Sequence, residues 1–77
     1  MSHRPHRRLD ATGVRCPEVM DLARDAVEAM QVGQLLEVVA DDPVVFLDLP
    51  DWCASAGHEV LSMEQRRDVI TTLMRVG

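Results

Sequence analysis

A chain of 77 residues has room for one small core, because a domain of this size buries only about 60% of the surface that its unfolded chain exposes. We therefore expect a single domain over residues 1–77. The formal net charge is −5, and an acidic body disfavours direct binding to nucleic acid, whose affinity depends on neutralised phosphates. No apolar run approaches the roughly 20 residues of a membrane span, no signal-peptide pattern follows the basic start of the chain, and there are two cysteines. These features exclude a membrane protein and a disulfide framework, and they predict a cytoplasmic location.

The first half of the chain predicts a strand, a helix and a second strand. Residues 1–6 form a basic segment that we expect to be flexible, and residues 6–12 form the strand, which Gly13 ends. A helix is then predicted from Pro17, which suits the first helical position, towards Gly33, which suits a stop. Its apolar residues recur at the spacing of one helical face: Val19, Leu22, Ala23, Ala26, Val27 and Met30. Residues 34–40 form the second strand.

The second half predicts another helix and a hairpin. Asp42 and Pro43 are typical of a helix N-cap followed by its first residue. Pro50 leaves two alternatives: a helix that bends there, or a helix that begins near Asp48 with Pro50 in its first turn. Gly57 ends the helix, and residues 58–64 and 68–76 form two strands joined by a tight turn at 65–67.

The element order is therefore βαβαββ. It predicts a two-layer α/β sandwich, in which both helices cover one face of a four-stranded mixed sheet. The first two strands should be parallel and the last two antiparallel.

Cys16 is the candidate for chemistry, because it lies at or near the N-cap of the first predicted helix. Free N–H groups and the helix dipole favour a thiolate there, and the dipole contributes about 0.3–1 kcal/mol. Arg15 and the nearby Arg7 and Arg8 would add to this effect, whereas Glu18 and Asp21 would oppose it. We expect a modestly lowered pKa. The alternative for an isolated cysteine at this position is an ordinary capping or buried residue.

Other polar and sulfur-containing residues are assigned structural roles. Cys53 falls on the apolar side of the second helix and is expected to be a buried thiol. Asp42 is expected to cap that helix, and Asp41 to orient the neighbouring loop. No His, Cys or acidic residues have the spacing of a metal site, so we expect no metal and no cofactor.

The stretch Leu9-Asp10-Ala11-Thr12-Gly13-Val14-Arg15-Cys16-Pro17-Glu18 resembles the N-terminal signature of the TusA/SirA-like sulfur-carrier family, where a strand leads to a Cys-Pro-x-Pro motif. The resemblance continues through residues 30–33, 40–43, 48–50, 53 and 57–59. It implies the same βαβαββ fold and makes Cys16 the residue that carries sulfur as a persulfide. Gly13, Arg15, Pro17 and Glu18 would form its supporting loop and helix start.

The resemblance also implies protein partners. A cysteine desulfurase or a rhodanese-like protein would supply the sulfur, and a downstream protein would accept it. The pathways that members of the family serve are tRNA thiolation, molybdenum cofactor assembly and sulfur oxidation.

Two departures from the family pattern stand out. Val19 replaces the second proline of the motif. The polar stretch that usually follows the Asp-Pro pair is here Val45-Phe46-Leu47, which predicts either an apolar contact patch for a partner or local burial.

Two alternatives to a sulfur carrier remain. One is a non-catalytic binding or regulatory module on the same fold, favoured by Val19 and by the apolar stretch. The other is an RNA-binding protein, favoured by the basic N-terminus and opposed by the acidic body and the near absence of aromatic residues. We expect a monomer or a weak homodimer.

Overall fold

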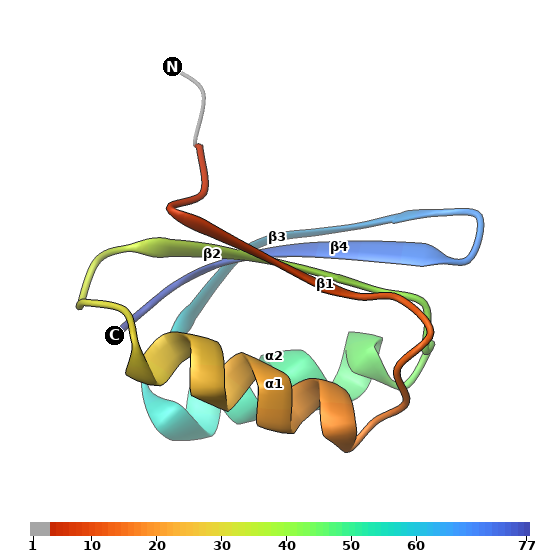
Figure 1. Cartoon of the computed structure of the whole chain (residues 1–77), viewed down its shortest axis with the longest axis horizontal. Helices are drawn as coiled ribbons and strands as arrows, with labels where there is room; N and C mark the ends of the chain where they lie inside the picture. The colour runs from red at the N-terminus through yellow and green to blue at the C-terminus, as the bar shows by residue number, and fades with distance from the viewer. Residues whose placement is uncertain (1–3) are drawn as a thin grey trace.

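The computed structural model describes residues 4–77 and shows one sheet with two helices packed against one of its faces (Figure 1). The elements follow the order β1 (Arg7–Ala11), α1 (Glu18–Glu28), β2 (Leu35–Ala40), α2 (Val45–Ala56), β3 (Glu59–Arg66) and β4 (Val69–Arg75). The predicted two-layer βαβαββ sandwich, with both helices on one side, is confirmed.

The sheet has the strand order β1-β2-β4-β3. β1 and β2 are parallel, while β4 is antiparallel to both of its neighbours, β2 and β3. β4 thus inserts between two strands that precede it in the chain. One result is that the connections leading from β1 into α1 and from β2 into α2 lie at the same end of the molecule (Figure 1).

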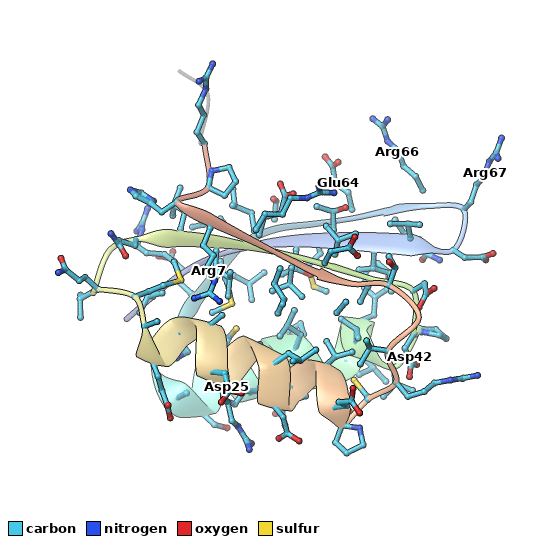
Figure 2. All side chains as sticks on the ribbon, in the orientation of Figure 1. Arg7, Asp25, Asp42, Glu64, Arg66 and Arg67 are labelled. Atoms are coloured by element: carbon cyan, nitrogen blue, oxygen red, sulfur yellow. The ribbon has the colours of Figure 1, made fainter. Side chains whose placement is uncertain are left out.

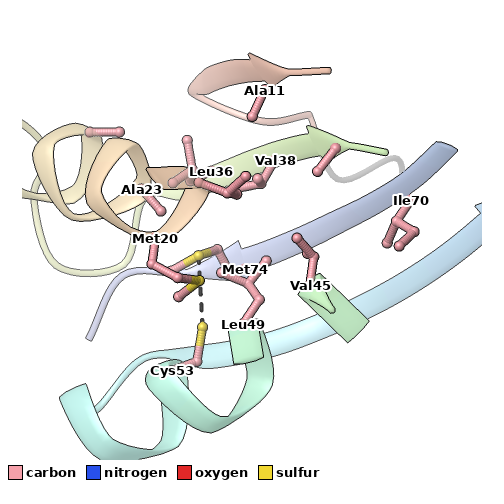
Figure 3. Close-up of a cluster of buried hydrophobic side chains, with 13 residues drawn as sticks. Ala11, Met20, Ala23, Leu36, Val38, Val45, Leu49, Cys53, Ile70 and Met74 are labelled. Carbon is pink, nitrogen blue, oxygen red and sulfur yellow. Dashed lines mark hydrogen bonds between the residues drawn. The ribbon is translucent and has the colours of Figure 1, made fainter. Parts of the chain in front are cut away.

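Alternate residues of the strands form the core under the helices. Leu36, Val38 and Ala40 of β2 are opposite Met74, Thr72 and Ile70 of β4, and all six are buried. Side chains along a strand point to opposite faces in turn, so every second residue reaches the helical layer. The helices add small and aliphatic side chains to this core (Figure 3), namely Val19, Met20, Ala23, Ala26, Val45, Leu49 and Cys53.

The start of α1 differs by one residue from the prediction. The helix begins at Glu18, and Pro17 is its N-cap residue rather than its first residue. The backbone at Pro17, with φ −88° and ψ 0°, is outside the helical range, which shifts the start by one position. Cys16 therefore lies in the connection before the helix.

The second helix continues through Pro50. It starts at Val45, so the alternative start near Asp48 is wrong. The N-cap residue is Val44, so Asp42 is not the N-cap residue that the sequence predicts, and Pro43 lies before the helix. Its first turn is tight, with N–H groups of Val45, Phe46 and Leu47 each donating to the carbonyl three residues earlier. Pro50 has no N–H to donate to Phe46, and the surrounding bonds maintain the helix.

The turn of the β3–β4 hairpin is displaced from its predicted place, because β3 continues two residues further, to Arg66, and β4 begins one residue later, at Val69. The predicted turn at 65–67 is instead the two-residue connection Arg67-Asp68. Arg67 adopts a left-handed backbone, with φ +57°, as two-residue hairpin connections require. The side-chain amide of Gln65 donates to the Arg67 carbonyl at 2.9 Å and supports this conformation.

The start of the described chain is tied to β2. His6 donates its N–H to the Leu35 carbonyl at 2.8 Å, and its Nδ1 accepts the Leu35 N–H at 3.0 Å. Residues 1–3 of the segment that we expect to be flexible lie outside the described residues. Neither helix of residues 4–77 has the length and apolar character needed to cross a membrane.

Candidate functional site

Cys16 lies in the connection between β1 and α1, two residues before the helix begins. Its side chain is half-buried and packs against the edge of the core. The connection is joined to the helix by hydrogen bonds from the Val19 N–H to the Arg15 carbonyl at 3.2 Å, and from the Met20 N–H to the Pro17 carbonyl at 3.0 Å. The thiol is thus placed beside an ordered helix start and within reach of solvent.

The side chain of Asp42 connects this segment to the second helix. Its Oδ2 accepts the backbone N–H of Cys16 at 3.0 Å, and its Oδ1 accepts the N–H of Val44 at 3.0 Å. The carboxyl is buried, with 8% of the residue exposed. One carboxylate therefore fixes the backbone of Cys16 and the start of α2 at the same time.

Asp41 binds an earlier residue of the connection between β1 and α1. Its Oδ1 accepts the N–H of Gly13 at 3.0 Å. Gly13 has φ +81°, a backbone conformation that glycine adopts without steric cost. Together with Arg15 and Asp42, these residues line an open cavity of about 220 Å³ next to the Cys16 segment.

The electrostatics around Cys16 differ from the prediction. Burial raises the pKa of the Cys16 thiol above its ordinary value, and the negative charges of Asp42 and Asp48 raise this pKa further. The modestly lowered pKa expected from the sequence is wrong, because the fold buries the thiol and brings the negative charges of Asp42 and Asp48 near it. Arg8, expected to favour the thiolate, instead donates to Glu37 at 2.9 Å across β1 and β2.

The surroundings of Asp42 stabilise its negative charge. Hydrogen bonds from the N–H groups of Val44 and Cys16 hold the pKa of the Asp42 carboxyl below its ordinary value, and Arg15 contributes to the same effect. Asp42 therefore remains a carboxylate that accepts both bonds throughout the neutral range.

The three apolar residues after the Asp-Pro pair have different environments. Val45 is buried, with 1% exposed, so local burial is the alternative that holds for this residue and a place in a surface patch does not. It is the first residue of α2 and points towards the sheet with Leu49, one turn later. Phe46 is half-buried, whereas Leu47 is 76% exposed.

Two residues near the site were not singled out from the sequence. Val44, 46% exposed, binds the same carboxylate as Cys16, and Asp48 raises the pKa of the Cys16 thiol. The predicted parallel pairing of the first two strands could have indicated both residues, because it places the starts of the two following helices side by side. Glu18, in the first turn of α1, is exposed.

Cys53 is confirmed as a core thiol. It is 1% exposed, and its Sγ donates to Met74 Sδ at 3.9 Å (Figure 3). Burial raises the pKa of Cys53 to about 11. Val19, which replaces the second motif proline, is fully buried in the same core. Within residues 4–77, no three His, Cys, Asp or Glu side chains are grouped to hold a metal ion.

Comparisons with known proteins agree with this arrangement. The crystal structure of the SirA-like protein from Desulfitobacterium hafniense superposes with a TM-score of 0.80 at 22% identity, covering 92% of this chain and 97% of that chain. This similarity shows the fold: two helices on one face of a four-stranded mixed sheet. The family described as "Sulfurtransferase TusA" matches residues 7–76. The chain therefore belongs to the TusA sulfurtransferase family and is a sulfur-carrier domain of that family.

Proposed function

We propose that Cys16 carries sulfur as a persulfide and relays it from a donor protein to an acceptor protein. In the loading step the Cys16 thiolate attacks the terminal sulfur of a donor persulfide. A new S–S bond forms at Cys16, the S–S bond of the donor breaks, and the donor cysteine leaves as a thiolate. One sulfur atom moves and no external oxidant or reductant is consumed.

The observation that carries this proposal is the way Cys16 is held. Its thiol is half-buried yet accessible, and its backbone N–H is fixed at 3.0 Å by the buried carboxylate of Asp42. A carrier needs a thiol presented at a defined position, and it does not need a general base. Membership of the TusA family supports the same role.

The donor in this proposal is a cysteine desulfurase or a rhodanese-like protein, and the acceptor serves tRNA thiolation, molybdenum cofactor assembly or sulfur oxidation. Residues 1–77 would act as one domain in the cytoplasm, where thiols stay reduced between transfers.

Intact-protein mass spectrometry tests the proposal. The chain is incubated with a cysteine desulfurase and cysteine, and in parallel with inorganic polysulfide. We expect a gain of one sulfur atom that dithiothreitol reverses, in the wild type and in Cys53→Ala but not in Cys16→Ala. If Cys16 takes up no sulfur from either source, the carrier role is wrong.

A non-catalytic binding module is the second candidate. The exposed side chain of Leu47 favours it, because a large apolar residue at 76% exposure suits a contact with another protein. The same experiment separates the two functions, since a binding module has no need of a reactive Cys16.

A further inference from the structure

The formal charge of the protein is concentrated in its helical layer. α1 contains four acidic residues and one arginine, and α2 contains two acidic residues and no basic one. These two helices therefore account for the whole net charge of −5. The remaining seven acidic residues and seven arginines balance one another, so the helical layer is an acidic face on an otherwise neutral molecule.

Exposed apolar side chains lie within this acidic layer at the Cys16 end. Val44 and Leu47 are 46% and 76% exposed, and the same Asp42 carboxylate binds the N–H groups of Val44 and Cys16 at 3.0 Å each. Asp48 and Asp51 follow Val44 and Leu47 at helical spacing and are exposed. We call Val44, Leu47, Asp48 and Asp51 the docking face.

A groove between the two helices continues the docking face. It has a volume of about 270 Å³ and is lined by Met20, Arg24, Asp48, Asp51, Trp52 and Ser55. Arg24 is within 3.7 Å of Asp21, so the positive charge at this groove is already opposed by an acid. The groove thus combines the apolar side chains of Met20 and Trp52 with two acidic ones, and it includes Asp48, whose charge acts on the Cys16 thiol.

We propose that the docking face binds a sulfur-donor protein whose surface is basic around an apolar depression that receives Leu47. Complementary charge orients such a partner and speeds its association. Leu47 supplies the desolvated apolar contact at the centre. The proposal rests on the proposed function, since it identifies the kind of protein that loads Cys16.

The electrostatics of the thiol explain why the donor, rather than the acceptor, matches this surface. Loading requires Cys16 as a thiolate, and Asp42 and Asp48 oppose that charge in the free protein. A basic surface placed over Asp48 offsets this negative potential when the donor arrives. Docking therefore activates the nucleophile in the same step that brings the persulfide to it.

Rates of sulfur loading from two sources test this proposal. The protein donors are the persulfide-loaded cysteine desulfurases and rhodanese-like proteins of the same organism, and the small donor is sodium polysulfide, which does not dock. For Leu47→Ser and for Asp51→Lys we expect kcat/KM with the best protein donor to fall about tenfold more than the rate with polysulfide. The protein-donor rate should also fall as ionic strength rises.

Two matched variants control for apolar exposure and for total charge. Val32 is 80% exposed beyond the far end of α1, so Val32→Ser removes a similar apolar side chain outside the docking face. Asp25 lies on α1 away from Asp42 (Figure 2), so Asp25→Lys changes the net charge as much as Asp51→Lys does. Both controls should load from the protein donor at the wild-type rate.

The outcomes distinguish the docking face from the carrier role. If Asp25→Lys and Asp51→Lys lose the same fraction of the loading rate with the protein donor, the effect comes from the total charge of the protein, and the docking face is overturned. The docking face would also be overturned if Leu47→Ser and Asp51→Lys loaded from the protein donor at the wild-type rate. The same holds if the wild type takes up sulfur from polysulfide but from none of the protein donors. Failure with polysulfide as well would instead reject the proposed function.

Discussion

Asp42 lies 26 residues after Cys16 and joins that part of the chain to the start of α2, because its two carboxylate oxygens accept one N–H each from Cys16 and Val44. In Asp42→Asn the amide nitrogen cannot accept an N–H, so one of these bonds is lost and the Cys16 segment is less well positioned. We expect loading from polysulfide to slow on the order of tenfold.

The control for Asp42→Asn is Asp41→Asn, in which the amide oxygen can still accept the Gly13 N–H. This variant should load at close to the wild-type rate. A pH series gives an independent check. Because the pKa of Asp42 is lowered in the fold, its stabilising contribution is present above the ordinary value of 3.8 and is lost as the pH falls through the lowered pKa. Asp42→Asn should lack this acid-dependent loss, and an unchanged acid transition would show that the carboxylate does not hold the two segments.

Asp48 lies close enough to Cys16 for its charge to raise the pKa of the thiol. Removing that charge in Asp48→Asn should lower this pKa, so that alkylation of Cys16 by iodoacetamide accelerates at a lower pH than in the wild type. Mass spectrometry of the alkylated peptides gives the rate at Cys16 separately from the rate at buried Cys53. Asp25→Asn removes an equal charge from the other helix, α1, and should not shift the dependence of the alkylation rate on pH. Identical profiles for both variants would contradict the effect of the Asp48 charge on the Cys16 thiol.

Thr72 places a hydroxyl in the core without a hydrogen-bond partner among residues 4–77. The residue is fully buried on β4, opposite Val38 of β2 and Met63 of β3. A buried hydroxyl that loses its bonds to water costs about 1–3 kcal/mol, so Thr72→Val should raise the free energy of unfolding by about 1 kcal/mol in urea denaturation. Thr72→Ser keeps the hydroxyl and removes a methyl group, and it should be destabilising. A loss of stability in Thr72→Val would mean that the hydroxyl is bonded in solution.

Gly57 ends α2 in a left-handed conformation, with φ +86°, and the N–H of His58 then donates to the Cys53 carbonyl at 2.8 Å. A Cβ at this position would meet no atom within 4 Å, so the cost of Gly57→Ala comes from the backbone conformation alone. That cost is about 1–2 kcal/mol of unfolding free energy for an L-residue. Gly57→Asn should lose less, because asparagine tolerates this conformation better. Equal losses in the two variants, measured by thermal unfolding, would contradict this account.

The helices and strands could be predicted because their signals are local. The apolar spacing of α1 and the glycine after α2 lie within a few residues of the structure that they determine. The same local rules placed Pro17 one position too far into the helix and left Pro50 with two alternatives. The backbone angles of Pro17 place it outside α1, and the hydrogen bonds donated by residues 45–47 start α2 well before Pro50.

The environment of Cys16 could be predicted only in part. Its position before a helix follows from the neighbouring residues, but the carboxylates of Asp42 and Asp48 reach it through the pairing of β1 with β2. Burial of the thiol, together with these two negative charges, reverses the direction of the pKa shift that the local sequence predicts. Likewise, the register of α2 buries Val45 and exposes Leu47, which a run of three apolar residues does not reveal.

Across the whole molecule, charge and apolar exposure follow the two layers. The helical layer carries the net charge and the exposed Leu47, while the hairpin of the sheet layer ends in Arg66 and Arg67 (Figure 2). The Cys16 segment lies where the starts of both helices meet. A partner that approaches Cys16 over the helices therefore encounters negative potential first, whereas one that approaches over the hairpin tip encounters two arginines and one acid, Asp68.

This division of charge bears on self-association. In a symmetric dimer each protomer contributes the same patch, so a dimer formed through the docking face would bring two acidic layers, each of −5, against one another. Repulsion of this kind is long-ranged at low ionic strength and is screened by salt. We therefore expect sedimentation velocity at low ionic strength to show a monomer, with any weak dimer appearing only as salt is added. Leu47→Ser should abolish that weak dimer, because it removes the apolar contact and leaves the charge unchanged. A dimer that is strongest at low salt would instead require opposite charges in contact, and would place the interface at the arginines of the sheet layer rather than at the docking face.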